Sequence, residues 1–352
     1  MAIDDQKLNE FVERVFGDLS SGYGLIMVNL GNKLGLYKAM AGAGPLNSRE
    51  VAKRAGCAER YVREWLNSQA AGGYVLYHPK SSTYELTSEQ AMVLANDTSP
   101  VFIPSALHIV AALWGEEEKA LNAIRTCEGV AWGDHDERVY CGVAAFYRNA
   151  YRGSLVNEWL PALDGVTDKL QAGAKVADIG CGHGHSTVLM AQAFPQSKFF
   201  GFDVHEDSIV VAKEIAEAAG VSDRVTFDVA DANGYPQDDY DLICFFDCLH
   251  DMGRPVDAAQ HAAKALAKDG TVMLIEPFAG DRVEDNINPV SRLYYTGSTL
   301  LCCAHAISEN GTHVLGAQAG PRQLGGVLEK AGFRHFRQAM QTPFNLILEA
   351  RL

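Results

Sequence analysis

Basic residues are scarce in this chain relative to acidic ones. The 352 residues include 30 Lys and Arg against 44 Asp and Glu, which gives a formal net charge of −14 at pH 7. A protein that neutralises many phosphates has at least a locally basic surface, so this imbalance disfavours a nucleic-acid partner. It equally disfavours an anionic membrane surface.

Long apolar runs and paired cysteines are also lacking. No stretch approaches the roughly 18 apolar residues of a membrane span, and the most apolar segment, 101–114, is interrupted by Pro104 and His108. The N-terminal residues lack the basic start and apolar core of a signal peptide. The eight cysteines form no C-x-x-C pair, which disfavours structural zinc, and we assign no metal ligands. We expect free thiols and a cytoplasmic location.

What the chain does contain is a glycine-rich turn between an apolar strand and a helix, at residues 176–194. Asp178 ends the strand, and Gly180, Gly182 and Gly184 follow at every second position. A dinucleotide site needs G-x-G-x-x-G with a third glycine inside the helix, where this chain has His185. The turn therefore indicates either a site for S-adenosylmethionine (SAM) or another nucleotide-binding α/β turn.

Acidic groups recur wherever a further strand is predicted to end. Alternating strands and helices predict a parallel sheet that binds its ligand at the carboxyl ends of the strands. Lys268-Asp-Gly270 predicts a turn before the strand expected at 271–276. Asp203 lies about 20 residues beyond the glycines, as expected of an acid that binds ribose hydroxyls. Asp231 and the adjoining Ala232 could meet an adenine amino group. The complete set of strand-end groups is Asp178, Asp203, Asp231, Asp247 with His250, and Glu276.

The first 95 residues predict helices followed by a β-hairpin, which is the order of a winged helix. Residues 49–64 include five basic residues and three acidic residues interleaved with them: Arg49, Lys53, Arg54, Arg60 and Arg63, and Glu50, Glu59 and Glu64. We therefore favour a dimerisation domain that also covers the active site over a DNA-binding domain. The apolar surface of the N-terminal helices favours a homodimer.

Together these patterns resemble the class I SAM-dependent methyltransferases, in which a Rossmann-like seven-stranded sheet binds the cofactor. With the mostly helical winged-helix front, the chain resembles the small-molecule O-methyltransferases of plants and bacteria. It is closer to a bacterial group, including mycobacterial members, through residues 59–66 and 176–194. The resemblance implies a winged-helix and dimerisation domain at 1–95 and a helical connector at 96–165. It implies a SAM-binding α/β domain at 166–352, with a helical insertion at about 280–320.

The resemblance also implies roles for individual residues. The glycines and Asp247 lie by the methionine part of SAM, Asp203 holds the ribose, and Val204, Asp231 and Ala232 lie by the adenine. Asp178 and Cys181 of the turn are further candidate contacts, as are Tyr147 and Tyr151 on an aromatic helix just upstream, although such a stripe is more often core. Leu249-His250-Asp251 matches the plant motif whose histidine is the general base, and Glu276 matches the acid that orients it. Two features depart from the plant pattern: Met252 replaces its Trp, and the insertion does not resemble phenolic-binding sequences.

These roles predict methyl transfer from SAM to a hydroxyl group of a small molecule, with S-adenosylhomocysteine (SAH) as product. His250 is the expected base, because a neutral imidazole can accept the hydroxyl proton, and Glu276 or Asp251 would fix its tautomer. The plain structural alternative is that His250 packs against the sheet. The functional alternatives are S-methylation of a small thiol, a SAM-responsive DNA-binding regulator and an inactive SAM-binding subunit.

Overall fold

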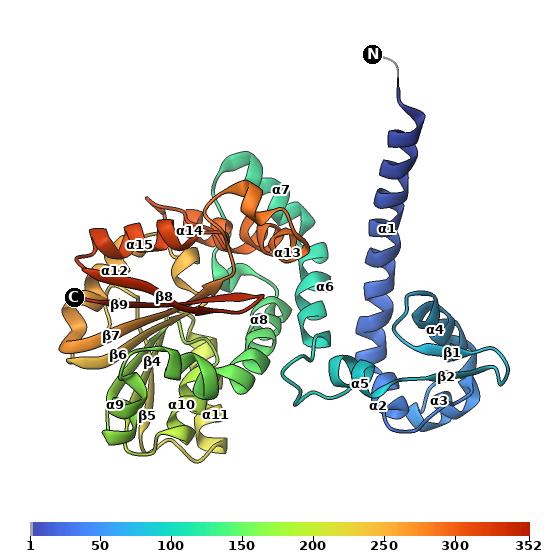
Figure 1. Ribbon diagram of the computed structural model, residues 1–352, viewed down its shortest axis with the longest axis horizontal. Coiled ribbons are helices and arrows are strands. Elements are labelled where there is room, and N and C mark those ends of the chain that lie inside the picture. Colours follow the sequence, from blue (N-terminus) through green and yellow to red (C-terminus); the bar gives the residue numbers. More distant parts are fainter. Residues whose placement is uncertain (1–2) are drawn as a thin grey trace. The chain divides into compact units, whose positions relative to one another are not determined.

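The computed structural model describes residues 3–352, which form two compact units (Figure 1). The first contains the chain up to Trp114 together with Cys141–Asn149. The second contains Gly115–Tyr140 and Ala150–Leu352. Helix α8, Glu137–Ala150, contributes residues to both units, and the connector expected at 96–165 is likewise shared between them.

The first unit is a small helical domain with a hairpin. Asn47 and Glu50 form a reciprocal capping box at the start of α3. The hairpin pairs β1 with β2 in antiparallel register, with Tyr77 opposite Tyr84. Trp65 of α4 is buried and donates its indole N–H to the carbonyl of Met27 on α1. The elements are α1 (Asp5–Lys33), α2 (Leu36–Met40), α3 (Ser48–Ala55), α4 (Glu59–Ala71), β1 (Leu76–His78), β2 (Thr83–Glu85), α5 (Ser88–Leu94) and α6 (Leu107–Gly115).

Helix α1 exposes an apolar stripe over most of its length. Large side chains follow each other three or four positions apart, and each is about half exposed or more: Leu8, Val12, Val15, Leu19, Tyr23, Ile26 and Leu30. This spacing is that of a helix that packs along another helix. The backbone at Gly17 and Gly24 is also open, because a Cβ at either position would meet nothing within 4 Å.

The second unit is built on the seven-stranded sheet that the sequence predicted. Its order is β5-β4-β3-β6-β7-β9-β8; β5 to β7 are parallel, and β9 is antiparallel to both β7 and β8. The carboxyl ends of β3, β4 and β6 therefore meet at one edge. The strands are β3 (Lys175–Ile179), β4 (Lys198–Asp203), β5 (Val225–Val229), β6 (Tyr240–Phe246), β7 (Leu266–Pro277), β8 (His335–Gln341) and β9 (Asn345–Arg351).

Helices cover both faces of this sheet, with α12 and α15 on one side and α10 and α11 on the other (Figure 1). Small residues of α12, such as Ala258 and Ala262, share a buried cluster with Leu324 and Leu328 of α15. The helices are α7 (Glu117–Thr126), α9 (Val166–Ala172), α10 (His185–Ala193), α11 (Glu206–Ala218), α12 (Pro255–Ala265), α13 (Pro289–Gly297), α14 (Cys303–Ser308) and α15 (Pro321–Lys330). Two π-helical segments, Tyr151–Trp159 and Ser298–Cys302, continue α8 and α13.

One local prediction was wrong. The sequence suggested a turn at residues 268–270 before a strand, but β7 already begins at Leu266. Leu266 pairs with Tyr240, and the register then shifts so that Leu242 lies opposite Thr271. An irregularity of this kind accommodates the extra residues without ending the strand. Among residues 3–352, no helix is both long enough and apolar enough to cross a membrane.

Candidate functional site

The glycine turn is held in a conformation that only glycine adopts easily. Gly180, Gly182 and Gly184 have φ values of +68°, +51° and +70°. A Cβ at Gly184 would lie 2.4 Å from Phe227 Cζ, and one at Gly180 would lie 2.9 Å from Cys248 Sγ, so packing also requires both glycines. A Cβ at Gly182 would meet nothing within 4 Å. The turn is therefore packed on both sides and open at its centre.

The two acids nearest the turn have different roles. Asp203, at the end of β4, accepts the backbone N–H groups of Gly182 at 2.8 Å and His205 at 2.9 Å, one on each oxygen. Each oxygen keeps a second lone pair for a ligand hydroxyl. Asp178 is buried and accepts the hydroxyls of Ser186 and Thr187 on α10. Burial raises the pKa of Asp178 to about 6, although these two hydroxyls oppose the shift.

The residues expected around an adenine lie at the ends of β4 and β5. Val204 is 50% exposed and offers an apolar surface directly after Asp203. Asp231 is exposed, and one of its oxygens accepts the backbone and side-chain N–H groups of Asn233, which shapes the turn after β5. Cys181 is buried, so only its backbone could face a ligand. Ala232 is half-buried in the same turn as Asp231.

Asp247 follows β6 with a φ of +51°, which is uncommon for a residue other than glycine. Its two oxygens accept the Tyr151 hydroxyl at 2.9 Å and the Asn345 amide at 3.1 Å. Burial and the neighbouring Glu276 raise the pKa of Asp247 well above its usual range. A strained, buried carboxylate is typical of a functional site. Of the two aromatic candidates, Tyr151 is thus joined to this edge, whereas Tyr147 belongs to the first unit, where its ring contacts Phe146.

His250 and Glu276 form a buried pair at the same edge of the sheet. His250 lies in a short 3₁₀ turn after β6 and Glu276 lies near the end of β7, at 3% and 1% exposure. The distance from His250 Nδ1 to Glu276 Oε2 is 2.5 Å. Burial acts to lower the pKa of His250, but Glu276, Asp251 and Cys302 outweigh it and raise this pKa well above its usual value. The bond to Nδ1 leaves Nε2 to face other groups.

Sequence reasoning did not identify Cys302 as a neighbour of this pair. Cys302 ends the π-helical segment Ser298–Cys302, and its thiol lies close enough to His250 for a hydrogen bond. His250, Asp251 and Cys302 each offer one potential ligand atom, and these atoms lie within 4.8 Å of one another. No motif or residue spacing in the sequence indicates that Cys302 lies near His250, because only the folding of the insertion brings the two residues together.

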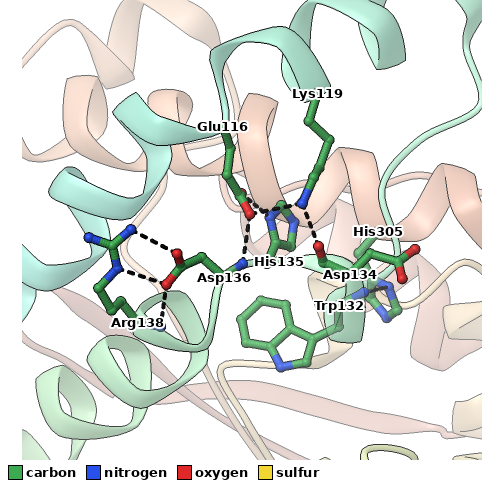
Figure 2. A network of polar contacts seen from close by, with 8 residues as sticks. All are labelled: Glu116, Lys119, Trp132, Asp134, His135, Asp136, Arg138 and His305. Carbon is green, nitrogen blue, oxygen red and sulfur yellow. Dashed lines mark hydrogen bonds and ion pairs between the residues drawn. The ribbon is translucent and has the colours of Figure 1, made fainter.

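A second network unnoticed in the sequence lies in residues 116–138 of the same unit (Figure 2). Glu116 accepts from the backbone of Asp136 at 2.6 Å and contacts His135 Nδ1 at the same distance. Trp132 packs edge-on against His135, and its backbone N–H donates to His305 Nδ1 on α14. A Cβ at Gly133 would lie 3.4 Å from His205. This segment therefore joins the carboxyl end of β4 to the insertion.

These residues fit an adenosyl cofactor. The open face of Gly182 gives room for a ligand close to the backbone, and the remaining lone pairs of Asp203 suit a vicinal diol. Within the described part of the chain, the buried oxygens Asp178 Oδ1 and Glu276 Oε1 have no hydrogen-bond partner. Buried acceptors of this kind require an explanation, and Glu276 Oε1 lies at the edge where the predicted methyl transfer would occur.

Two known families match parts of this chain. Residues 170–332 match the family described as Methyltransferase domain, and residues 23–96 match the Rv2258c-like winged HTH domain. The 27-O-demethylrifamycin SV methyltransferase of Amycolatopsis mediterranei is 34% identical over 107 residues, 30% of this chain and 39% of that protein. The uncharacterized methyltransferase YcgJ of Bacillus subtilis is 28% identical over 130 residues, 36% of this chain and 51% of that protein. The chain thus spans about two fifths to half of the length of these relatives.

Solved structures resemble the whole chain. A putative O-methyltransferase from Nostoc punctiforme is 20% identical with a TM-score of 0.69, and the match covers 99% of both chains. Human N-acetylserotonin methyltransferase, solved in complex with SAM, is 18% identical with a TM-score of 0.71, and the match covers 97% of both chains. At these identities the likeness establishes the fold.

Proposed function

We propose that this chain, in which an Rv2258c-like winged helix-turn-helix domain precedes a methyltransferase domain, transfers a methyl group from SAM to a hydroxyl group of a small molecule. Both domains are those that the sequence resemblance predicted. The observation that carries the proposal is the His250–Glu276 contact at 2.5 Å, at the sheet edge that also holds the glycine turn. This edge of the sheet therefore combines a base and its positioning carboxylate with a turn that has room for the cofactor.

In this proposal SAM supplies a methyl group that its sulfonium already activates. The open backbone at Gly182 and the carboxylate of Asp203 would hold the cofactor, and Asp247 would lie by its methionine end. Glu276 holds the proton of His250 on Nδ1, so that Nε2 can accept the proton of the acceptor hydroxyl. Asp251 lies beside the same imidazole and adds to its basicity. The buried surroundings exclude water from this proton transfer.

The first experiment is calorimetric titration of SAM and SAH into the wild type and Asp203→Ala. We expect binding in the wild type and a large loss in the variant, because the variant removes the acceptors for the ribose diol. Hydroxyl and thiol compounds are then screened for methylation by mass spectrometry. Methylated thiols without methylated hydroxyls would support S-methylation instead, since a thiol ionises more easily and needs less help from a base.

The base is tested with a matched pair of histidine variants. His250→Ala should bind SAH as the wild type does and lose methyl transfer. His261→Ala is the control, because His261 lies on α12 and contacts only the Tyr235 carbonyl among the described polar partners. Equal activity in His250→Ala and the wild type would contradict the assignment of the base.

We further propose that the first unit makes a homodimer and does not bind DNA. The stripe on α1 offers a second copy the three- and four-residue spacing of a helix–helix seam. The arginines of α4 are already paired with acids, Arg60 with Glu64 at 2.6 Å and Arg63 with Glu59 at 2.7 Å. Two arginines paired with two glutamates leave no net positive charge among these four residues of α4 for a phosphate backbone.

A further inference from the structure

We propose that His250, Asp251 and Cys302 form a binding site for Zn²⁺ or a chemically similar divalent ion. The three residues supply one imidazole nitrogen, one carboxylate oxygen and one sulfur, all within 4.8 Å of one another. Zinc is bound by this combination of ligand types. Mg²⁺ and Ca²⁺ prefer oxygen ligands alone, so the sulfur and nitrogen select against them.

The geometry requires only a small contraction. Zinc–ligand distances of about 2.0–2.3 Å in a tetrahedral arrangement place neighbouring ligand atoms roughly 3.6 Å apart. The observed atoms must therefore approach by about 1 Å at most, which rotations of the short Asp251 and Cys302 side chains can supply. His250 moves least, because Glu276 holds its ring and Gly316 donates its backbone N–H to the His250 carbonyl at 3.0 Å. Asp251 is only half-buried and gives the ion a path of entry.

The surrounding charges favour a cation at this point. Asp251 and Glu276 both lie beside one imidazole, and a metal ion that binds Cys302 displaces its thiol proton to solvent. Metal-bound histidines commonly donate their second ring N–H to a carboxylate, which fixes the tautomer. Glu276 already occupies that position on Nδ1, so Nε2 is the nitrogen left for the metal. Three protein ligands leave a fourth position for water.

The metal and the acceptor hydroxyl compete for the same nitrogen. If His250 is the base of the proposed function, on which this consequence rests, a metal on Nε2 removes the lone pair that accepts the proton. The metal-bound protein is then inactive in hydroxyl methylation, and the metal-free protein is active. Methyl transfer should therefore be inhibited by a bound divalent metal ion and restored by a chelator.

Metal binding is tested without substrate by titrating Co²⁺ into chelator-treated protein and recording its absorption. We expect a sulfur-to-cobalt charge-transfer band, the visible bands of a four-coordinate ion, and their displacement by Zn²⁺ but not by Mg²⁺. Cys302→Ala should lose the charge-transfer band. Cys303→Ala is the matched control, because the adjacent thiol contacts Ser298 and should leave the band unchanged. Glu276→Gln should keep the band and weaken the affinity by about 10- to 100-fold.

SAH titration and circular dichroism of each variant confirm that the fold is intact, and Cys302→Ser provides a second variant of nearly the same volume. A charge-transfer band of equal intensity in Cys302→Ala and the wild type, or no band in the wild type, overturns the site. These results do not depend on methyl transfer. Conversely, a protein that binds Co²⁺ through Cys302 but methylates at an unchanged rate in His250→Ala would retain the metal site and refute the proposed base.

Discussion

Alanine substitutions at Gly182 and Gly184 should separate the stability of the glycine turn from its ligand binding. Both glycines have positive φ, so both substitutions incur the left-handed backbone cost of about 1–2 kcal/mol. Only at Gly184 does the new methyl group meet the protein, because it would lie 2.4 Å from Phe227 Cζ and 3.0 Å from Ala212 Cβ. Phe227 is itself buried and cannot swing aside.

The contact with Phe227 adds an overpacking cost of about 1–3 kcal/mol, so Gly184→Ala should lose roughly 2–5 kcal/mol of unfolding free energy. Gly182→Ala should lose about 1–2 kcal/mol. For a domain of this size the difference of about 1–3 kcal/mol corresponds to about 2–12 °C in midpoint temperature. Thermal unfolding followed by circular dichroism measures it.

The two substitutions should affect SAH binding in the opposite order to their effects on stability. The methyl group of Gly182→Ala points into the open space where we place the cofactor, so SAH affinity should fall by about 5- to 150-fold, the equivalent of 1–3 kcal/mol of steric cost. Calorimetric titration of SAH into the variant measures this loss. Equal losses of stability in the two variants would refute the packing argument, and wild-type SAH affinity in Gly182→Ala would refute the placement of the cofactor.

Three further predictions follow from single groups. The rate of methyl transfer should rise with pH through a midpoint above 6.5, because the neighbouring carboxylates raise the pKa of His250. Glu276→Gln should lower that midpoint, and NMR titration of the imidazole checks both expectations. Between pH 3.8 and about 6 the folded protein binds a proton at Asp178 that the unfolded chain does not. Its free energy of unfolding relative to Asp178→Asn should therefore fall by roughly 3 kcal/mol as pH rises through that window. Urea unfolding measures this change. Leu19→Asp on α1 should convert the proposed dimer to a monomer in light scattering, whereas exposed Tyr61→Asp on α4 should not.

The sequence predicted the elements whose position follows from topology alone. Parallel strands must end at a common edge, so Asp178, Asp203 and Asp247 could be placed together before any coordinates. The structure adds what topology does not contain, namely which groups each acid contacts. Asp178 faces α10 and accepts two hydroxyls, whereas Asp203 faces the turn. Their roles as cofactor contacts stay predictions.

The structural features that sequence reasoning missed depend on contacts between residues that are far apart in the chain. Cys302 reaches His250 only because the insertion folds back over the turn that follows β6, and no periodic pattern records that contact. The Trp132–His305 hydrogen bond likewise joins the segment before α8 to helix α14, 173 residues further along the chain. The turn expected at residues 268–270 was wrong for a related reason, since Gly270 lies against the Tyr240 carbonyl and the Leu266 side chain inside the strand.

The negative charge at the carboxyl edge of the sheet explains why a proton, the cofactor and a metal ion are each favoured there. Asp247, Asp251 and Glu276 are brought together around one imidazole, and burial makes their negative charge costly unless a cation lies nearby. A proton on His250, the sulfonium of SAM and a divalent metal ion each meet that need, but at different atoms. The sulfonium would lie by Asp247, and the proton and the metal compete at His250. The edge can therefore bind the cofactor in either state of the imidazole, while the proposed transfer of a methyl group requires that His250 be free of both.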